Sequence, residues 1–96
     1  MFIGFQAVAA TSTLKNVGSL TIPAGATGAQ IQSETAPVRF TMDGSSFNPT
    51  STVGMLLKLT DMPREYLIED IRRIRFCRDG SSDGVLNIHY FAGRNI

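Results

Sequence analysis

The stretch VRFTMDG, residues 38–44, decides the fold class of this chain. Side chains alternate between the two faces of a strand, so Val38, Phe40 and Met42 would share one face and the polar residues between them the other. The Asp43-Gly44 pair that follows is a strong turn signal. This combination predicts a strand with one buried face that ends in a tight turn.

Segments of the same kind lie on both sides of this stretch. We expect strands at residues 2–9, 19–22, 29–34, 53–59, 66–68, 74–77 and 85–91, and a loop or weak edge strand at 11–19. In the last strand, Val85, Asn87, His89 and Phe91 would face one side and Leu86, Ile88 and Tyr90 the other. Residues 23–28, 45–52 and 79–84 are rich in small and polar residues and are predicted to be turns or loops.

Residues 64–78 carry signals for both helix and strand. Leu67, Ile68, Ile71 and Ile74 have helical spacing, whereas Ile74 and Phe76 alternate with polar residues as in a strand. We expect a strand, then a single helical turn near residues 69–72, and then a second strand.

These elements predict an all-β fold built from about eight short strands. The pattern contains no helix long enough to join parallel strands, so the sheets should be mainly antiparallel. We expect one domain over residues 1–96, a small antiparallel β-sandwich that is jelly-roll-like and has at most one helical turn.

The composition of the chain disfavours two classes of partner, nucleic acid and membranes. Hydrophobic residues make up 43% and charged residues 18%, and the formal net charge is +1. A chain this close to neutral has no global field to attract nucleic acid or an anionic membrane. Residues 1–10 lack a preceding basic residue, are interrupted by Gly4 and Gln6, and are too short to span a bilayer, so they predict neither a signal peptide nor a membrane anchor.

Reactive side chains do not form a recognisable catalytic or metal-binding pattern. His89 is the single histidine. Residues 80–84 (GSSDG) have the G-x-S-x-G spacing, but they belong to the predicted loop 79–84 and precede a strand, whereas a nucleophile elbow joins a strand to a helix. One histidine and Cys77 cannot supply a tetrahedral metal site, and Asp79 and Asp83 lack the third acidic ligand of an EF-hand loop. We therefore predict a protein that is not an enzyme and that has no catalytic residue, metal site or cofactor.

Arginine is the residue type that points to binding. Arg72, Arg73, Arg75 and Arg78 form a local basic cluster, and Arg39 lies on the polar face of the 38–42 strand. Acidic residues lie next to the cluster in the sequence, which favours contact with protein or a plain mixed-charge surface over contact with nucleic acid. The candidate protein-contact residues are Arg39, Arg73, Arg75 and Arg78.

Several of these segments together resemble a set of small tailed-phage virion proteins. They are residues 20–32 (LTIPAGATGAQIQ), 38–44 (VRFTMDG), 49–50 (PT) and 53–55 (VGM), followed by 74–76 (IRF) and 86–90 (LNIHY). The resemblance covers most of the chain from Leu20 to Phe91, as a pattern of turns and strands. The strand at residues 2–9 lies outside its strongest part.

The resemblance implies a virion component that is made in the host cytoplasm. Our first hypothesis is a capsid decoration, or cement, protein that binds the major capsid protein as a homo-oligomer and stabilises the head. The alternatives are a neck, tail or fibre-adaptor subunit that contacts other virion proteins, and a small carbohydrate- or nucleic-acid-binding β-domain. Besides the arginines, loops 45–52 and 79–84 are candidate contacts. No membrane partner is expected.

Overall fold

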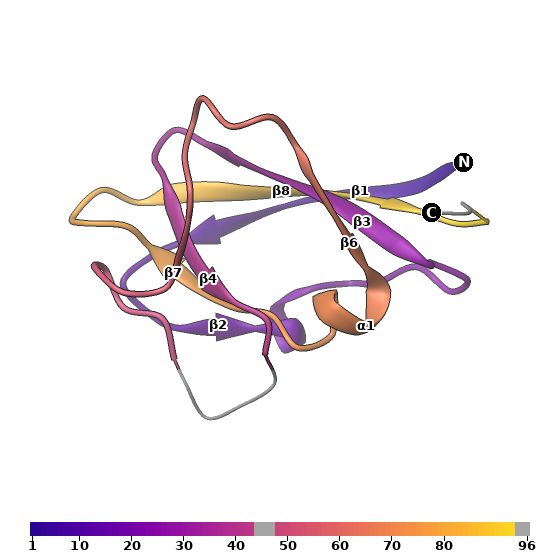
Figure 1. Ribbon diagram of the computed structural model, residues 1–96, viewed down its shortest axis with the longest axis horizontal. Coiled ribbons are helices and arrows are strands. Elements are labelled where there is room, and N and C mark those ends of the chain that lie inside the picture. The colour runs from indigo at the N-terminus through magenta and orange to yellow at the C-terminus, as the bar shows by residue number, and fades with distance from the viewer. Residues whose placement is uncertain (44–47, 94–96) are drawn as a thin grey trace.

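Eight short strands and two helical turns make up the part of the chain that the computed structural model describes, residues 1–43 and 48–93 (Figure 1). The strands are β1 (Phe2–Ala10), β2 (Lys15–Asn16), β3 (Gly28–Glu34), β4 (Val38–Thr41), β5 (Met55–Leu57), β6 (Arg64–Leu67), β7 (Arg75–Arg78) and β8 (Gly84–Phe91). The turns are the 3₁₀ helix η1 (Val17–Ser19) and the α-helix α1 (Ile68–Ile71). The chain is therefore all-β apart from these two turns.

The strands form two four-stranded sheets with nested pairing. We call the sheet with order β1-β8-β3-β6 the long sheet and the sheet with order β2-β7-β4-β5 the short sheet. The first strand pairs with the last, the second with the seventh, the third with the sixth and the fourth with the fifth, all antiparallel. This nesting is a jelly roll, so the prediction of a small, jelly-roll-like β-sandwich is confirmed.

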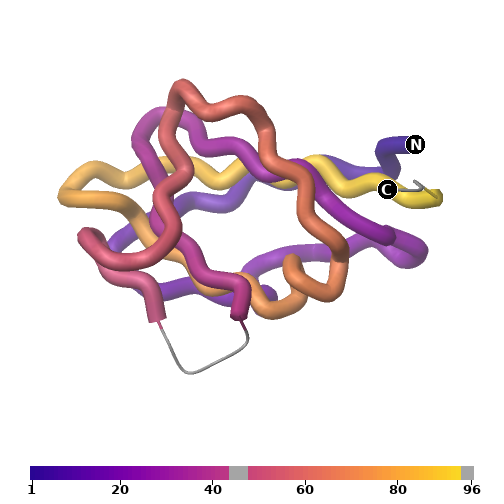
Figure 2. The backbone as a smooth tube through the Cα atoms, in the orientation of Figure 1, coloured from indigo at the N-terminus to yellow at the C-terminus, as the bar shows by residue number. Residues whose placement is uncertain are grey.

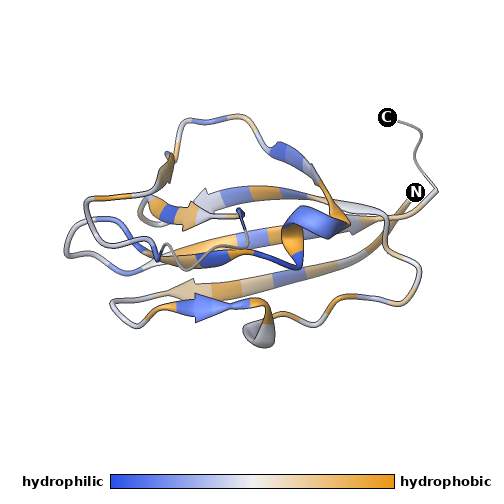
Figure 3. Ribbon diagram, turned by 60° about the horizontal axis from the view of Figure 1, so that its bottom comes forward, coloured by the Kyte–Doolittle hydropathy of each residue, from blue (hydrophilic) through white to orange (hydrophobic). Residues whose placement is uncertain are grey.

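The core lies between the two sheets. Its largest fully buried side chains include Ile31, Val38, Phe40, Leu57, Phe76, Leu86, Ile88 and Tyr90. Figure 3 shows the alternation of polar and apolar residues along the strands. The predicted inward-facing set of β4 is therefore confirmed, except that Met42 lies just past the strand and is only partly buried against the core. On β8, where the pattern did not decide between the two faces, Leu86, Ile88 and Tyr90 face the core. Each fully buried aliphatic or aromatic side chain contributes about 1.5–3 kcal/mol.

The strand predicted at residues 19–22 is wrong. The chain there leaves η1 as an irregular extended segment, and the neighbouring strand is the two-residue β2. Leu20 and Ile22 do pack against the core, which explains their alternation with polar residues. A side chain replaces the strand ladder here: Gln6 Oε1 accepts a hydrogen bond from the Thr21 amide at 2.9 Å, and Gln6 Nε2 donates to the Ser19 carbonyl at 3.2 Å.

The helical turn predicted near residues 69–72 is present as α1, one residue earlier in the sequence. Ile68 and Ile71 are buried, which accounts for the helical spacing of the apolar residues. The Ile68 amide donates to the Thr27 carbonyl at 2.9 Å and so fixes the start of the turn against the residue that precedes β3. The turn carries the chain from β6 in the long sheet to β7 in the short sheet (Figure 1).

Two further differences concern the strand ends. The strand predicted at residues 53–59 is confined to β5, Met55–Leu57. Gly44 of the predicted Asp43-Gly44 turn and residues 45–47 of the predicted 45–52 loop lie outside the described residues. Residues 48–54, which are described, contain no strand and run to β5.

A β-bulge shapes the start of β1, which runs beside β8 along its length (Figure 2). The register shifts between Phe2 and Gly4. Without the shift, Phe2 would share the inward face of Gly4, because side chains alternate along a strand. The extra residue turns Phe2 to the outer face of the long sheet, opposite Phe91.

Candidate protein-contact surfaces

Arg39 is bound by other parts of the fold and does not present a free guanidinium. It lies on β4, and its Nε donates to Asp79 Oδ1 at 2.7 Å. Its Nη1 donates to the Gly54 carbonyl at 3.1 Å. Arg39 therefore ties β4 to two segments, the loop after β7 and the segment before β5.

Arg78 is also paired. It ends β7, and its Nη1 donates to Asp83 Oδ1 at 2.7 Å across the loop that leads to β8. The two carboxylates of the predicted 79–84 contact loop, Asp79 and Asp83, thus each accept a hydrogen bond from an arginine. Within the described residues, no group of three or more His, Cys, Asp or Glu side chains is placed to hold a metal ion.

The other two predicted arginines, Arg73 and Arg75, lie together in a groove that also includes Arg72. This arginine groove has a volume of about 500 Å³ and is lined by Asn16, Val17, Gly18, Arg72, Arg73, Ile74 and Arg75. One wall is the chain that leaves α1 and enters β7, and the other is η1, because β2 pairs with the start of β7. The sequence placed Arg72 in the basic cluster but not among the candidates.

The arginines of the groove differ from the paired arginines in their partners. Arg72 and Arg73 are exposed, and neither takes part in the three ion pairs found among residues 1–43 and 48–93. Arg75 donates from Nη1 to Asn48 Oδ1 at 2.8 Å, a neutral partner. The groove therefore carries three positive charges without a bound carboxylate in the described part of the chain.

An exposed aromatic cluster on the outer face of the long sheet was not predicted. The ring of His89 on β8 stacks on Phe2 at a centroid distance of 3.8 Å, and Phe5 meets His89 edge-on at 6.1 Å. Phe2 also meets Phe91 edge-on at 6.1 Å. Phe2 is 43% exposed and Phe5 64% exposed. We call the surface formed by Phe2, Phe5 and His89 the aromatic face.

The polar surroundings of the aromatic face are mostly neutral. A shallow pocket of about 110 Å³ beside Phe5 is also lined by Gln30, Gln32, Pro63, Asn87 and His89. Gln30 and Asn87 donate hydrogen bonds to glutamates at 3.0 Å. One signal for this face was present in the sequence, the placement of His89 and Phe91 on the same face of β8. The bulge that brings Phe2 to that face depends on pairing with β8 and has no local signature.

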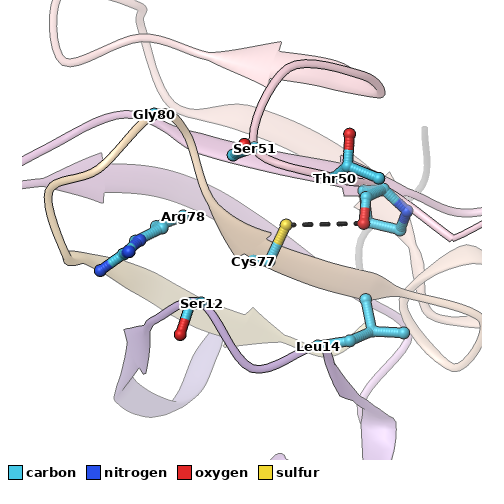
Figure 4. Close-up of a pocket in the computed structure, with 8 residues that line it drawn as sticks. Ser12, Leu14, Thr50, Ser51, Cys77, Arg78 and Gly80 are labelled. Atoms are coloured by element: carbon cyan, nitrogen blue, oxygen red, sulfur yellow. Dashed lines mark hydrogen bonds between the residues drawn. The ribbon is translucent and has the colours of Figure 1, made fainter.

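Cys77 lies in a third cavity, of about 290 Å³, on the short sheet. Figure 4 shows its thiol pointing to the Pro49 carbonyl, and the Sγ–O distance is 3.6 Å. Burial raises the pKa of the Cys77 thiol above its ordinary value of 9.0. The group is thus a protonated thiol at neutral pH, which is a poor nucleophile.

Comparison with known proteins identifies no relative of this chain: no protein-family model, no curated protein and no solved structure matches it. No helix in residues 1–43 and 48–93 has the length and apolar character needed to cross a membrane. Two of the surfaces described above are candidate sites. The aromatic face carries exposed phenylalanine rings, and the arginine groove carries arginines that form no ion pair within the described residues.

Proposed function

We propose that this protein is a structural component of a tailed-phage virion that decorates the capsid by binding the major capsid protein. The observation that carries the proposal is the aromatic face. Apolar patches that stay exposed on a small protein commonly mark an interaction site. Aromatic side chains are enriched in the buried centres of protein interfaces, and charged residues are depleted there.

The fold and the sequence resemblance support the same proposal from another side. Jelly rolls occur in viral capsid and lectin domains, although a fold alone does not select a function. Four of the segments that resemble phage virion proteins contribute to β3, β4, β7 and β8, which are the central strands of both sheets, and segments 49–50 and 53–55 lead into the edge strand β5. The resemblance therefore concerns the scaffold, whereas the aromatic face depends on β1, outside its strongest part.

Decoration requires many identical copies, each with a modest interface. A surface built from two or three aromatic anchors would bind weakly as a single copy. Copies that also contact each other, as in a homo-oligomer, would bind together with much higher avidity. The capsid would be stabilised by the added interface between its subunits.

Cryo-electron microscopy of particles assembled with and without this chain tests the proposal. Decoration predicts density for the chain over the whole shell, at hundreds of copies per particle. Density confined to a ring of about a dozen copies or fewer at the portal or tail would instead support a neck, tail or fibre-adaptor role. Particles without the chain at any position would exclude the decoration role and the neck, tail and fibre-adaptor roles.

A pair of variants tests the aromatic face itself. Phe5→Ser removes the most exposed ring of the face, and we expect capsid binding at least about tenfold weaker, as for an interface anchor. Leu59→Ser is the matched control, because Leu59 is 46% exposed but lies beyond β5 of the short sheet. Equal effects of the two substitutions would exclude the aromatic face as the contact.

A further inference from the structure

We propose that the arginine groove is a second binding site, which takes an acidic segment of a partner protein through its carboxylates. The proposal stands on the position and pairing of Arg72, Arg73 and Arg75. It does not depend on the capsid role, since it concerns a different sheet and a different chemistry from the aromatic face.

The first step is that the three arginines lie close together in the chain and line one groove. Arg72 caps the end of α1, Arg73 follows, and Arg75 begins β7, so the three occupy one short connection. All three line the same groove of about 500 Å³, and η1 forms its other wall. Like charges repel, so three arginines that share a groove without a bound carboxylate favour an anionic ligand.

The second step is that the fold pairs its other arginines. Arg39, Arg64 and Arg78 each contact an aspartate at 2.7 or 2.8 Å. Glu69 and Asp70 lie on α1, close to the groove in sequence, but neither takes part in an ion pair found in the described part of the chain. Within that part of the chain, the groove is thus the one place where several arginines lie together and none of them forms an ion pair with a carboxylate.

The third step concerns the identity of the ligand. Arginine binds carboxylate and phosphate in a bidentate geometry. Single-stranded nucleic acid also needs rings on which bases stack, and no aromatic residue lines the groove. The net charge of +1 gives no long-range attraction for a nucleic-acid backbone. A short protein segment that carries two or three carboxylates fits these features better than a polynucleotide.

Titration of the ¹⁵N-labelled protein with a hexaglutamate peptide at low salt, followed by NMR, tests the proposal. We expect the largest shifts at the amides of residues 16–18 and 72–75, and weaker binding as added salt screens the charges. A hexalysine peptide should leave these amides unchanged. Shifts spread evenly over the surface would overturn the proposal, and tighter binding of an oligothymidylate of the same charge would replace it with a nucleic-acid site.

Variants separate the groove from general charge effects. Arg72→Gln with Arg73→Gln should weaken hexaglutamate binding about fivefold or more, as expected for the loss of two exposed ion pairs. Arg78→Gln is the control for a removed charge outside the groove, and it should change binding less than about twofold. Equal weakening by the control would overturn the proposal. Both residues of the double variant are exposed, so its thermal unfolding should match that of the parent protein.

Discussion

The outer faces of the two sheets differ in the side chains that they carry and in whether another segment covers them. The short sheet carries polar groups outward, and they hold residues 48–54 across it: Arg39 binds the Gly54 carbonyl, Arg75 binds Asn48, and the Cys77 thiol points to Pro49. The long sheet carries Phe2 and Phe5 outward, and no described segment covers them. The outer face of the long sheet therefore exposes apolar side chains, which is why we propose that a partner binds there.

This difference shows that polar and aromatic side chains on the outer face of a small sandwich are stabilised in different ways. Outward polar side chains can organise a loop, because each satisfies a backbone or side-chain partner. Outward aromatic side chains cannot be satisfied by a polar loop and instead gain from burial against another surface. Among the described residues, segment 48–54 therefore covers part of the outer face of the short sheet, whereas Phe2 and Phe5 on the long sheet stay exposed.

The largest expected effect separates the buried from the free part of the aromatic cluster. Phe91 is fully buried, and its ring fills the space over Gly28. Phe91→Ala should lower the free energy of unfolding by about 3–5 kcal/mol, as for other buried aromatic truncations. Phe5→Ala should cost less than about 1 kcal/mol, because Phe5 is largely exposed. Urea denaturation of both variants measures this contrast, and similar losses would show that Phe5 is a structural residue.

The second test concerns the covered face. Arg39→Ala leaves the Asp79 carboxylate and the Gly54 carbonyl without this donor, and should lower the free energy of unfolding by about 1–3 kcal/mol. Arg78→Ala should cost less than about 1 kcal/mol, since its partner Asp83 is exposed. Denaturant unfolding checks both values. An effect of Arg39→Ala no larger than that of Arg78→Ala would mean that the covering segment is not held by Arg39.

A third test addresses the layer between the two faces. Ser33 is buried on β3, and its hydroxyl has no hydrogen-bond partner in the described part of the protein. Ser33→Ala removes a desolvated polar group with little change of volume, and should raise the free energy of unfolding by about 1 kcal/mol. A thermal melt that moves upward is the expected result. A lower melting temperature would reveal a partner for this hydroxyl in the folded protein.

The smallest effect is expected in the turn between β5 and β6. A hydrogen bond from the Lys58 amide holds the pKa of the Asp61 carboxyl below its ordinary value of 3.8, with help from Arg64. A folded-state pKa below the unfolded value stabilises the protein above the unfolded pKa, and this stabilisation is lost as the pH falls through the folded pKa. Asp61→Asn should therefore destabilise slightly at pH 7, with the difference vanishing at strongly acidic pH. A difference that stays constant with pH would contradict this account.

The sequence predicted most of the scaffold but little of the surface. Alternation predicted the buried face of β4 and the division of the β8 residues into two faces, and turn residues predicted most of the connections. The same rule failed at residues 19–22, because a segment can alternate by packing on a core without pairing in a sheet. Two of the four candidate arginines, Arg39 and Arg78, belong to ion pairs within the chain. The sequence did not predict these pairs, because their aspartate partners lie in the loop between β7 and β8, whose path no local pattern specifies.

The sequence by itself therefore determined which residues of a strand share a face, because that property depends on the period of two along a single segment. Tertiary structure alone decided how the eight strands nest, which sheet face is covered, and where Phe2 points. Those features rest on contacts between residues far apart in the chain, such as Phe2 with His89 and Phe91. No segment read in isolation carries information on such contacts, and both surfaces proposed here for binding depend on them.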